Sequence, residues 1–398
     1  MSLRVLYTAF DVVPSPKGAS RHITAFAQAL AQAGYQVTLF TAGLDGLPEV
    51  ETYAGARIIR WPNGEQNYLR RAQGFGDAVW EHLRDHQGGY DVVHFRDLWS
   101  GSAALEARGS LGYAYRTLYE VNGLASVELK YVYPDLKDSD LPERLRQQES
   151  KLLRHADQVV CVSRVTAIYL KSMGAKAEKL HIIRNGVDES QFTPDSPLPG
   201  DPPVLLYLGT LAPWQGLDCL VRAMPTILAA FPEAQLHLVG PYKRLQHKEL
   251  VKLAGKLGLE AEQINFAGPV RPEEAPQWLA RATVCLAPLA LNDRNVSQGC
   301  CPIKLLEYAA AGRPIVAADL PVARELLRED ECLYFQPNDP DDLARGVIRL
   351  LEDLPAAQAM ARRAARSVRR KFTWQRAGEE LIRIYQNIRL EQFSGVAR

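Results

Sequence analysis

The chain has 398 residues, of which 47% are hydrophobic and 23% charged, and its 47 basic and 46 acidic side chains leave a net charge of +1. This length is enough for two domains of ordinary size, each with its own core. The balanced charge gives no support for a nucleic-acid partner, and no stretch approaches the ~18 to 20 uncharged apolar residues of a transmembrane helix.

Short β-branched or aromatic runs alternate with helical patterns in the first half of the chain, which predicts α/β architecture with a mainly parallel sheet. A strand, a helix and a strand open the pattern as one βαβ unit at 4–9, 20–33 and 36–41. Later strands are expected at 56–59, 91–95, 116–121 and 158–163, and later helices at 68–85, 102–108 and 142–155.

The second half restarts the same alternation after a stretch at 194–203 that is rich in Pro, Asp and Gly, a composition typical of a linker. A strand, a loop and a helix are expected at 204–208, 209–216 and 217–230, with later strands at 235–239, 263–266, 283–288, 315–318 and 332–335. Two such series predict two doubly wound, Rossmann-like domains that face each other across a cleft.

The segment 302–317 has the pattern of a helix start, a buried helix with one carboxylate, a turn and an inner strand. Pro302 can occupy the first helical turn, and the preceding loop at 297–301 then directs free backbone amides at an anion. Lys304 adds a full positive charge, and Glu307 follows on the same helical face, so the pair can meet one ligand at phosphate and at sugar hydroxyls. The alternative is an ordinary helix with an exposed Lys–Glu ion pair.

This segment resembles the donor-sugar signature of the family-4 retaining glycosyltransferases, S-P-x-K-L-x-E-Y-x-A-x-G-x-P-I-V-A, and only the Ser is changed, to Cys301. Residues 184–188, Arg-Asn-Gly-Val-Asp, resemble the family's N-G-V-D segment between domains, and 283–288 its A-D-V-x-x-x-P strand. Residues 372–385 resemble its closing helix, which in proteins of the GT-B fold crosses back to the first domain.

The resemblance therefore implies the GT-B fold. It assigns 1–185, together with the C-terminal helix at 373–398, to an acceptor-binding domain, and 186–372 to a domain that binds a nucleotide-sugar donor.

The loop at 209–216 follows a strand and precedes a helix, where doubly wound folds bind phosphate, although a simple turn is the alternative. Many family members carry a G-R and a K-G pair here, and this chain has Gly209-Thr210 and Gln215-Gly216. Two cations are therefore missing from the implied diphosphate site.

More of the charge must then fall on Lys304 and on Arg294, which lies in a loop at 292–298 that we expect to be flexible. A merely solvated Arg294 is the alternative. The family's acidic motif has a first carboxylate where this chain has Gly299, so backbone amides of 298–301 are expected to contact the sugar instead. The remaining implied donor-binding residues are Val270, Ser297, Cys300, Cys301 and Ile303.

On the acceptor side, residues 16–20 resemble the family's Gly-rich loop, with Ala19 in place of the second Gly. A ligand can approach Gly18 closely because no side chain blocks it. The alternative is an ordinary helix N-terminus with Ser20 as its cap.

The segment 118–123 resembles a family strand that usually ends in His near the reacting centre, and Asn122 takes that place here. Asn cannot transfer a proton at neutral pH but can hold a sugar hydroxyl, and the implied retaining mechanism lets the leaving phosphate accept the proton. Arg96 and Asp97, at another strand end, could recognise the acceptor or simply be solvated. We expect Asn122, Lys304 and Glu307 to be the catalytic residues.

Two charged helices have alternative interpretations. The helix at 68–83 places Arg beside apolar side chains, which suits either weak contact with an anionic membrane or, as we favour, packing against the core. The basic run at 362–371 is interleaved with Ala and is typical of a solvated helix face.

The six cysteines have no Cys-x-x-Cys spacing or nearby His, which argues against a metal site or disulfide framework and favours a reducing compartment. The first ten residues contain no small-residue cleavage site, which argues against a signal peptide. We expect a cytoplasmic protein, with peripheral contact at the inner membrane as an open alternative.

The prediction is a retaining glycosyltransferase that moves a sugar from a UDP- or GDP-linked donor to an unidentified glycan, lipid-linked or small-molecule acceptor. No cofactor or bound metal is expected, because the acidic pairs at 135–140 lie far in sequence from the donor motifs. A catalytically silent GT-B binding or partner protein is the first alternative, given the substituted motif positions. A nucleotide-sugar 2-epimerase is the second, although Asn122 and Gly299 supply no acid or base.

Overall fold

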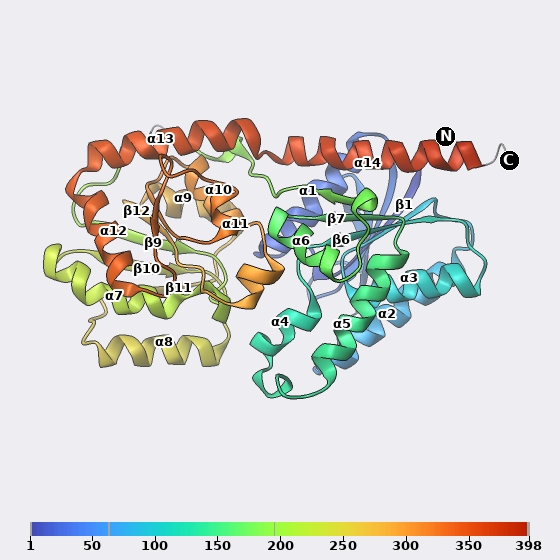
Figure 1. Ribbon diagram of the computed structural model, residues 1–398, viewed down its shortest axis with the longest axis horizontal. Helices are drawn as coiled ribbons and strands as arrows, with labels where there is room; N and C mark the ends of the chain where they lie inside the picture. Colours follow the sequence, from blue (N-terminus) through green and yellow to red (C-terminus); the bar gives the residue numbers. More distant parts are fainter. Residues whose placement is uncertain (1, 63, 195, 396–398) are drawn as a thin grey trace. The chain divides into compact units, whose positions relative to one another are not determined.

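The computed structural model describes residues 2–62, 64–194 and 196–395 and divides the chain into two compact units (Figure 1). Unit 1 comprises Met1–Arg184 with Trp374–Arg398, and unit 2 comprises Asn185–Thr373. Each of the two boundaries lies one residue from the place that the sequence analysis gives it. The carboxyl-terminal segment thus folds with the amino-terminal half of the chain.

Unit 1 contains an eight-stranded sheet in the order β3-β4-β2-β1-β5-β6-β7-β8. All neighbouring pairs are parallel except β3 and β4. The strands are β1 (Arg4–Val12), β2 (Gln36–Ala42), β3 (Val50–Tyr53), β4 (Ala56–Trp61), β5 (Val92–Phe95), β6 (Arg116–Val121), β7 (Gln158–Cys161) and β8 (Leu180–Ile182). The predicted parallel architecture is confirmed, and β3 and β8 were not predicted.

Successive side chains of each buried strand point to opposite faces of this sheet, so both faces are apolar. Helices cover both of them. Leu6 of β1 packs in one core, whereas its neighbour Tyr7 packs in the other, together with Phe26 of α1 and Leu381 of α14. The helices are α1 (Gly18–Gln32), α2 (Tyr68–Asp85), α3 (Leu98–Ser110), α4 (Ala125–Val132), α5 (Leu141–His155), α6 (Arg164–Ser172) and α14 (Trp374–Gly395). Helices α4 and α6 were not predicted from the sequence.

Unit 2 contains a six-stranded, fully parallel sheet in the order β11-β10-β9-β12-β13-β14. Its strands are β9 (Val204–Leu208), β10 (Gln235–Val239), β11 (Ile264–Gly268), β12 (Val284–Ala287), β13 (Ile315–Ala318) and β14 (Leu333–Phe335). Its helices are α7 (Leu217–Ala230), α8 (Arg244–Lys256), α9 (Ala275–Ala280), α10 (Ile303–Ala310), α11 (Pro321–Arg324), α12 (Pro340–Glu352) and α13 (Leu354–Lys371). Each unit is therefore doubly wound.

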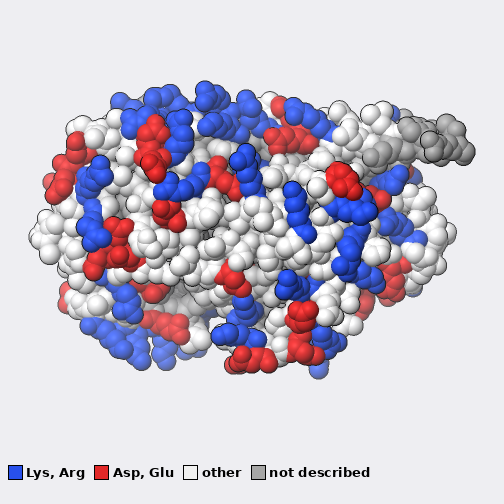
Figure 2. Space-filling model, in the orientation of Figure 1, with Lys and Arg blue, Asp and Glu red and all other residues white. Residues whose placement is uncertain are grey.

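The two charged helices discussed above, α2 and α13, are both amphipathic surface helices. In α2, Phe75 and Val79 are fully buried in the core of unit 1, which confirms the core-facing interpretation. Figure 2 shows Lys and Arg side chains gathered along α13, where Arg362 and Arg366 are exposed while the intervening alanines are buried. No helix in the described part of the chain is long and apolar enough to cross a membrane.

Candidate functional site

The candidate donor site lies in unit 2, at the carboxyl ends of β9 and β12. These strands are neighbours, but the chain continues from β9 to β10 on one side and from β12 to β13 on the other. Doubly wound folds bind their ligands where the loops of neighbouring strands diverge in this way. The predicted phosphate loop follows β9, and the predicted Arg294 loop follows β12.

Two glycines determine how closely the loop after β9 packs on its surroundings. Gly216 has a φ of +69°, and a Cβ on it would lie 2.2 Å from the carbonyl oxygen of Pro288, directly after β12. Only glycine fits this position without strain. A Cβ on Gly209 would lie 3.1 Å from Nζ of Lys304, so the bare backbone of this loop adjoins the lysine ammonium group.

Lys304 reaches this loop from the first turn of α10. Its Nζ donates hydrogen bonds to the Tyr207 hydroxyl at 2.7 Å and to Oε1 of Gln215 at 2.6 Å. Lys304 and Glu307 are 9% and 7% exposed. The alternative of an exposed Lys–Glu ion pair is therefore wrong, and Gln215, expected as a phosphate ligand, holds the lysine in place.

The charge on Lys304 depends on what binds beside it. Burial lowers the pKa of its ammonium group well below the ordinary value, the Cys300 thiol opposes this, and the nearby Arg294 guanidinium lowers the pKa further. Burial thus makes the charge on Lys304 costly in the unliganded protein. A diphosphate beside Nζ would restore the charge, because an anion stabilises the protonated form.

The stretch at 292–298 is not the flexible loop that we predicted. Residues Arg294–Gln298 form one π-helical turn, and Asn295 inside it is fully buried. Nδ2 of Asn295 donates to the carbonyl oxygens of Trp214 and Ala290, each at 2.8 Å. The bond to Trp214 attaches the turn to the loop after β9, and the bond to Ala290 attaches it to its own segment after β12. Asn295 was not singled out from the sequence.

Arg294 extends from this turn over the same loop. Its guanidinium carbon lies 5.3 Å from the centre of the Trp214 ring, and Nη1 donates to Oδ1 of Asn295 at 3.2 Å. Trp214 directly precedes Gln215, the partner of Lys304. Arg294 is thus placed beside the candidate phosphate site, and the solvated alternative does not describe it.

The backbone between the π turn and α10 is also fixed. Gly299 ends the turn with a φ of +79°, and the carbonyl oxygen of Cys301 accepts a hydrogen bond from Nδ2 of Asn185 at 2.7 Å. Pro302 precedes α10 rather than occupying its first turn. Of the other predicted donor ligands, the exposed ones are Thr210 and Ser297, the buried ones Gly299, Cys300 and Cys301, and the half-buried ones Val270 and Ile303.

The candidate acceptor site lies in unit 1, where the chain leaves β1 toward β2 and β5 toward β6 on opposite sides. Gly18 is exposed and Ala19 half-buried at the start of α1. Ser20 is not the cap of this helix: it lies inside the first turn, and its Oγ accepts a hydrogen bond from Ser15 N at 2.9 Å.

Arg96 and Asp97 follow β5 and are both engaged with the protein. Arg96 is 7% exposed and donates through Nε to Oε1 of Glu120 at 2.8 Å, so the solvated alternative is wrong for it. Asp97 caps α3 by accepting from Ser100 N at 2.8 Å, and it accepts from Phe10 N at 2.9 Å. The Asp97 carboxylate therefore joins the ends of β1 and β5.

Asn122 follows β6, and its Nδ2 donates a hydrogen bond to Glu120. Glu120 is fully buried and was missed by the sequence analysis, because it lies in an apolar strand. The structure thus brings Arg96 and Asn122 together through one carboxylate that the motif comparison did not indicate.

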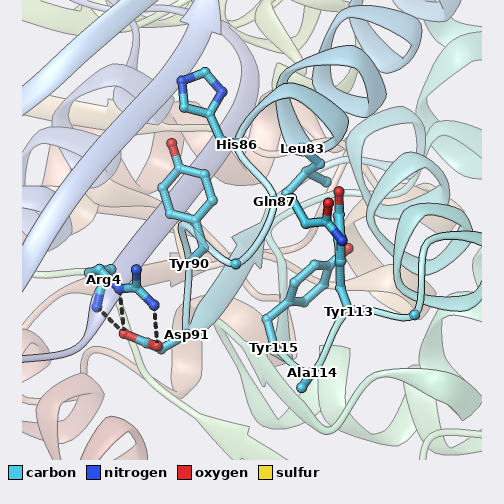
Figure 3. Close-up of a pocket in the computed structure, with 11 residues that line it drawn as sticks. Arg4, Leu83, His86, Gln87, Tyr90, Asp91, Tyr113, Ala114 and Tyr115 are labelled. Atoms are coloured by element: carbon cyan, nitrogen blue, oxygen red, sulfur yellow. Dashed lines mark hydrogen bonds and ion pairs between the residues drawn. The ribbon is translucent and has the colours of Figure 1, made fainter.

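A cavity of about 330 Å³ lies at the opposite edge of the same sheet (Figure 3). It is lined by residues near the starts of β1, β5 and β6, among them Arg4, Tyr90 and Tyr115. Arg4 pairs with Asp91 there, with Nη2 and Oδ1 2.9 Å apart. None of the predicted site residues lines this cavity, so it is not part of the candidate site.

Two family models match the chain. One, described as "Glycosyltransferase Family 4", matches residues 16–191, and the other, described as "Glycosyl transferases group 1", matches residues 202–353. Together they span most of both units and include the loops described above.

Full-length relatives agree with these matches. The chain is 28% identical to D-inositol 3-phosphate glycosyltransferase of a Nocardioides species, over 94% of this chain and 86% of the relative. It is 27% identical to phosphatidyl-myo-inositol mannosyltransferase of Mycobacterium tuberculosis, over 96% of this chain and 95% of the relative.

Solved structures show the same fold at lower identity. Sucrose-phosphate synthase from Thermosynechococcus elongatus superposes with a TM-score of 0.83 at 22% identity, over 98% of this chain and 100% of that one. Anabaena HepE, in a complex with UDP-glucose, superposes with a TM-score of 0.73 at 16% identity, over 97% and 100% of the two chains. The chain therefore belongs to the family-4 glycosyltransferases and has their GT-B fold.

Proposed function

We propose that this glycosyltransferase moves a hexosyl group, with retention of configuration, from a nucleotide-diphosphate sugar to a hydroxyl group of an acceptor, without a bound metal. The observation that carries the proposal is the meeting of Lys304, Gln215 and the bare backbone of Gly209 at the point where the loops of β9 and β12 diverge. Glu307, one turn further along α10, adds a carboxylate to the same site.

The roles follow from the chemistry of these groups. The diphosphate would lie against Lys304, the amides at the start of α10 and the guanidinium of Arg294, which together replace the two missing loop cations. The carboxylate of Glu307 would accept hydrogen bonds from the two vicinal hydroxyls of the nucleotide ribose. As the bond to the anomeric carbon breaks, Lys304 would stabilise the charge that develops on the leaving phosphate.

The acceptor would bind to unit 1. Its hydroxyl attacks the anomeric carbon, and its proton passes to the leaving phosphate oxygen, so no protein base is required. Asn122 would hold a sugar hydroxyl, and Gly18 and Ala19 would contact the acceptor through the backbone. Asp97 is left out of this proposal because its carboxylate already accepts bonds from Ser100 and Phe10.

Support for a nucleotide-sugar donor comes from HepE, which was crystallised with UDP-glucose and shares the fold. Among the described residues, no group of three or more His, Cys, Asp and Glu side chains is placed to hold a metal ion. A cytoplasmic location is proposed as well, since the six cysteines are buried and their spacing is not typical of a disulfide framework.

A thermal-shift screen tests the proposal. We expect one nucleoside diphosphate among UDP, GDP, ADP and TDP, or its sugar conjugate, to raise the melting temperature selectively and equally with and without magnesium. Slow release of free sugar from that conjugate would then identify an enzyme. Binding without any turnover would favour the catalytically silent alternative, and no stabilisation by any compound would contradict the proposal.

Proton uptake on donor binding is a second expected result. Because the pKa of Lys304 is lowered in the free protein and raised by a bound diphosphate, the complex holds one more proton at any pH between the two values. The affinity for the diphosphate should be greatest below the pKa of Lys304 in the free protein. Between this value and the higher pKa in the complex, the affinity should fall by up to about tenfold per pH unit.

Calorimetric titration over a series of pH values, in buffers of different ionisation enthalpy, measures this uptake directly. Between the two pKa values the slope should rise to about one proton per nucleotide bound, and it should vanish at every pH in Lys304→Met. An unchanged slope in the variant would assign the proton to another group.

A further inference from the structure

The core of unit 1 contains a cluster of polar groups around Glu120, at the carboxyl end of β6. The Glu120 side chain is completely buried. Five side chains from three other elements and two strand ends surround its carboxylate: Tyr7 of β1, His22 of α1, His94 of β5, Arg96 after β5 and Asn122 after β6.

The contacts are short. Oε2 of Glu120 accepts from the Tyr7 hydroxyl at 2.7 Å and lies 3.1 Å from Nε2 of His94. Oε1 accepts from Nε of Arg96 at 2.8 Å and lies 2.9 Å from Nε2 of His22. A buried carboxylate with this many donors is held in a single orientation.

The charge state of the cluster follows from these contacts. Burial alone would raise the pKa of Glu120, but the Arg96 charge and the surrounding donors outweigh it and hold the pKa well below the ordinary value. Burial lowers the pKa of His94, whose Nδ1 lies 3.0 Å from the Tyr385 hydroxyl of α14.

An ionised Glu120 determines which end of the Asn122 amide faces it. A carboxylate only accepts hydrogen bonds, so Nδ2 of Asn122 must point to Glu120, and Oδ1 must point away from it. Arg96 is oriented in the same manner, between Glu120 and Oδ2 of Asp11, which is 3.5 Å from Nη1. Our proposed function places Asn122 at the acceptor, and Arg96 adjoins it through the shared Glu120 carboxylate.

We propose that Glu120 is the positioning residue of the acceptor site, and that it fixes the Asn122 amide so that Oδ1 is presented as the acceptor of a hydrogen bond from a substrate hydroxyl. This inference rests on the proposed function. It implies that a substrate group which must receive a hydrogen bond, such as a carbonyl or ether oxygen, is disfavoured at this position, because two acceptor oxygens would then face each other.

A double-mutant cycle on the full-length protein tests this role. Glu120→Gln should lower kcat of transfer by about 10- to 100-fold, the kinetic equivalent of one hydrogen bond to a charged group. The same substitution in an Asn122→Ala background should lower kcat much less, because the side chain that it orients is gone. Equal losses in both backgrounds would overturn the proposal and leave Glu120 with a structural role.

Glu149→Gln is the matched control. Glu149 is another carboxylate buried in unit 1, and it accepts hydrogen bonds from N and Oγ of Ser126. It makes no contact with Asn122 or Arg96 in the described hydrogen bonds, so kcat should not change. A comparable loss of kcat in this control would show that any buried carboxyl group in the unit matters and would also overturn the proposal.

Asn122→Asp gives an independent readout in case Glu120→Gln does not fold. Two carboxylates would then share the site, and the introduced group can donate to Glu120 only when it is protonated. Activity of this variant should therefore rise as pH falls, relative to wild type at each pH. If the ratio of the variant's activity to wild-type activity does not change with pH, the proposed hydrogen bond is contradicted.

Nucleotide binding and sugar transfer, measured for the wild-type protein and for Glu120→Gln, separate this inference from the proposed function. The donor site lies in unit 2, so Glu120→Gln should leave the binding of the nucleoside diphosphate unchanged. If the wild-type protein neither binds nucleotides nor transfers sugar, the proposed function fails. If the wild-type protein transfers sugar and Glu120→Gln does so equally well, only the positioning role fails.

Discussion

Lys304→Met should lower kcat of sugar transfer by about 100- to 1,000-fold, the loss seen when one preorganised donor to a developing negative charge is removed. Nζ of Lys304 is buried beside the backbone of Gly209 and is held by Tyr207 and Gln215, so it needs no reorganisation to meet a leaving phosphate. The two cations that family members usually carry in this loop are replaced by Thr210 and Gln215. Besides Lys304, the proposed site then has the guanidinium of Arg294 to stabilise the leaving phosphate.

The variant should fold normally. Met is close to Lys in volume, and removing the buried ammonium group also removes its desolvation cost. The measurement is steady-state transfer with the nucleotide sugar found in the thermal-shift screen. Lys248→Met, which changes an exposed lysine of α8, is the control and should keep full activity. A folded Lys304→Met with wild-type kcat would remove Lys304 from the catalytic site.

Glu307→Ala should weaken binding of the nucleoside diphosphate by at least about 100-fold. If the carboxylate accepts from two vicinal hydroxyls, and each bond to a charged group contributes roughly 1.5 to 3 kcal/mol, the loss is several kcal/mol. Calorimetric titration of the nucleotide measures it. A 2′-deoxynucleotide should discriminate less between the variant and the wild-type protein, because one of the two hydroxyls is already missing.

Two controls accompany this variant. Thermal unfolding establishes that Glu307→Ala is folded, since the side chain is 7% exposed and its removal leaves a small cavity. Glu352→Ala, an exposed glutamate at the end of α12, should leave affinity unchanged. Unaltered nucleotide affinity in a folded Glu307→Ala protein would show that another group holds the ribose.

Much of the fold could be predicted because its elements are local patterns. The helix Tyr68–Asp85, the strand Val204–Leu208 and the helix Leu217–Ala230 begin and end at the predicted residues, since hydrophobic periodicity and flanking turns define them. The strand β3 was missed because it is a short edge strand with little buried surface. The start of α3 was predicted four residues late, because the Asp97 cap was interpreted as a possible ligand.

The candidate site was less predictable where distant residues decide the structure. Lys304 and Glu307 were found from a contiguous motif. The π turn at Arg294 was missed because it depends on Asn295 reaching Trp214, which lies 81 positions away in sequence. Glu120 was missed for the same reason: its partner Tyr7 is 113 positions away, and nothing in the sequence of β6 distinguishes a cluster carboxylate from a strand residue.

The carboxyl-terminal helix α14 has a consequence for how the protein is made. Leu381 and Tyr385 are fully buried in the core of unit 1, and Tyr385 also bonds to His94 of the Glu120 cluster. These residues leave the ribosome after the whole of unit 2. The amino-terminal half of the chain therefore cannot complete its core until α14 has been synthesised, whereas unit 2 can, and an apolar face on unit 1 must remain uncovered until then.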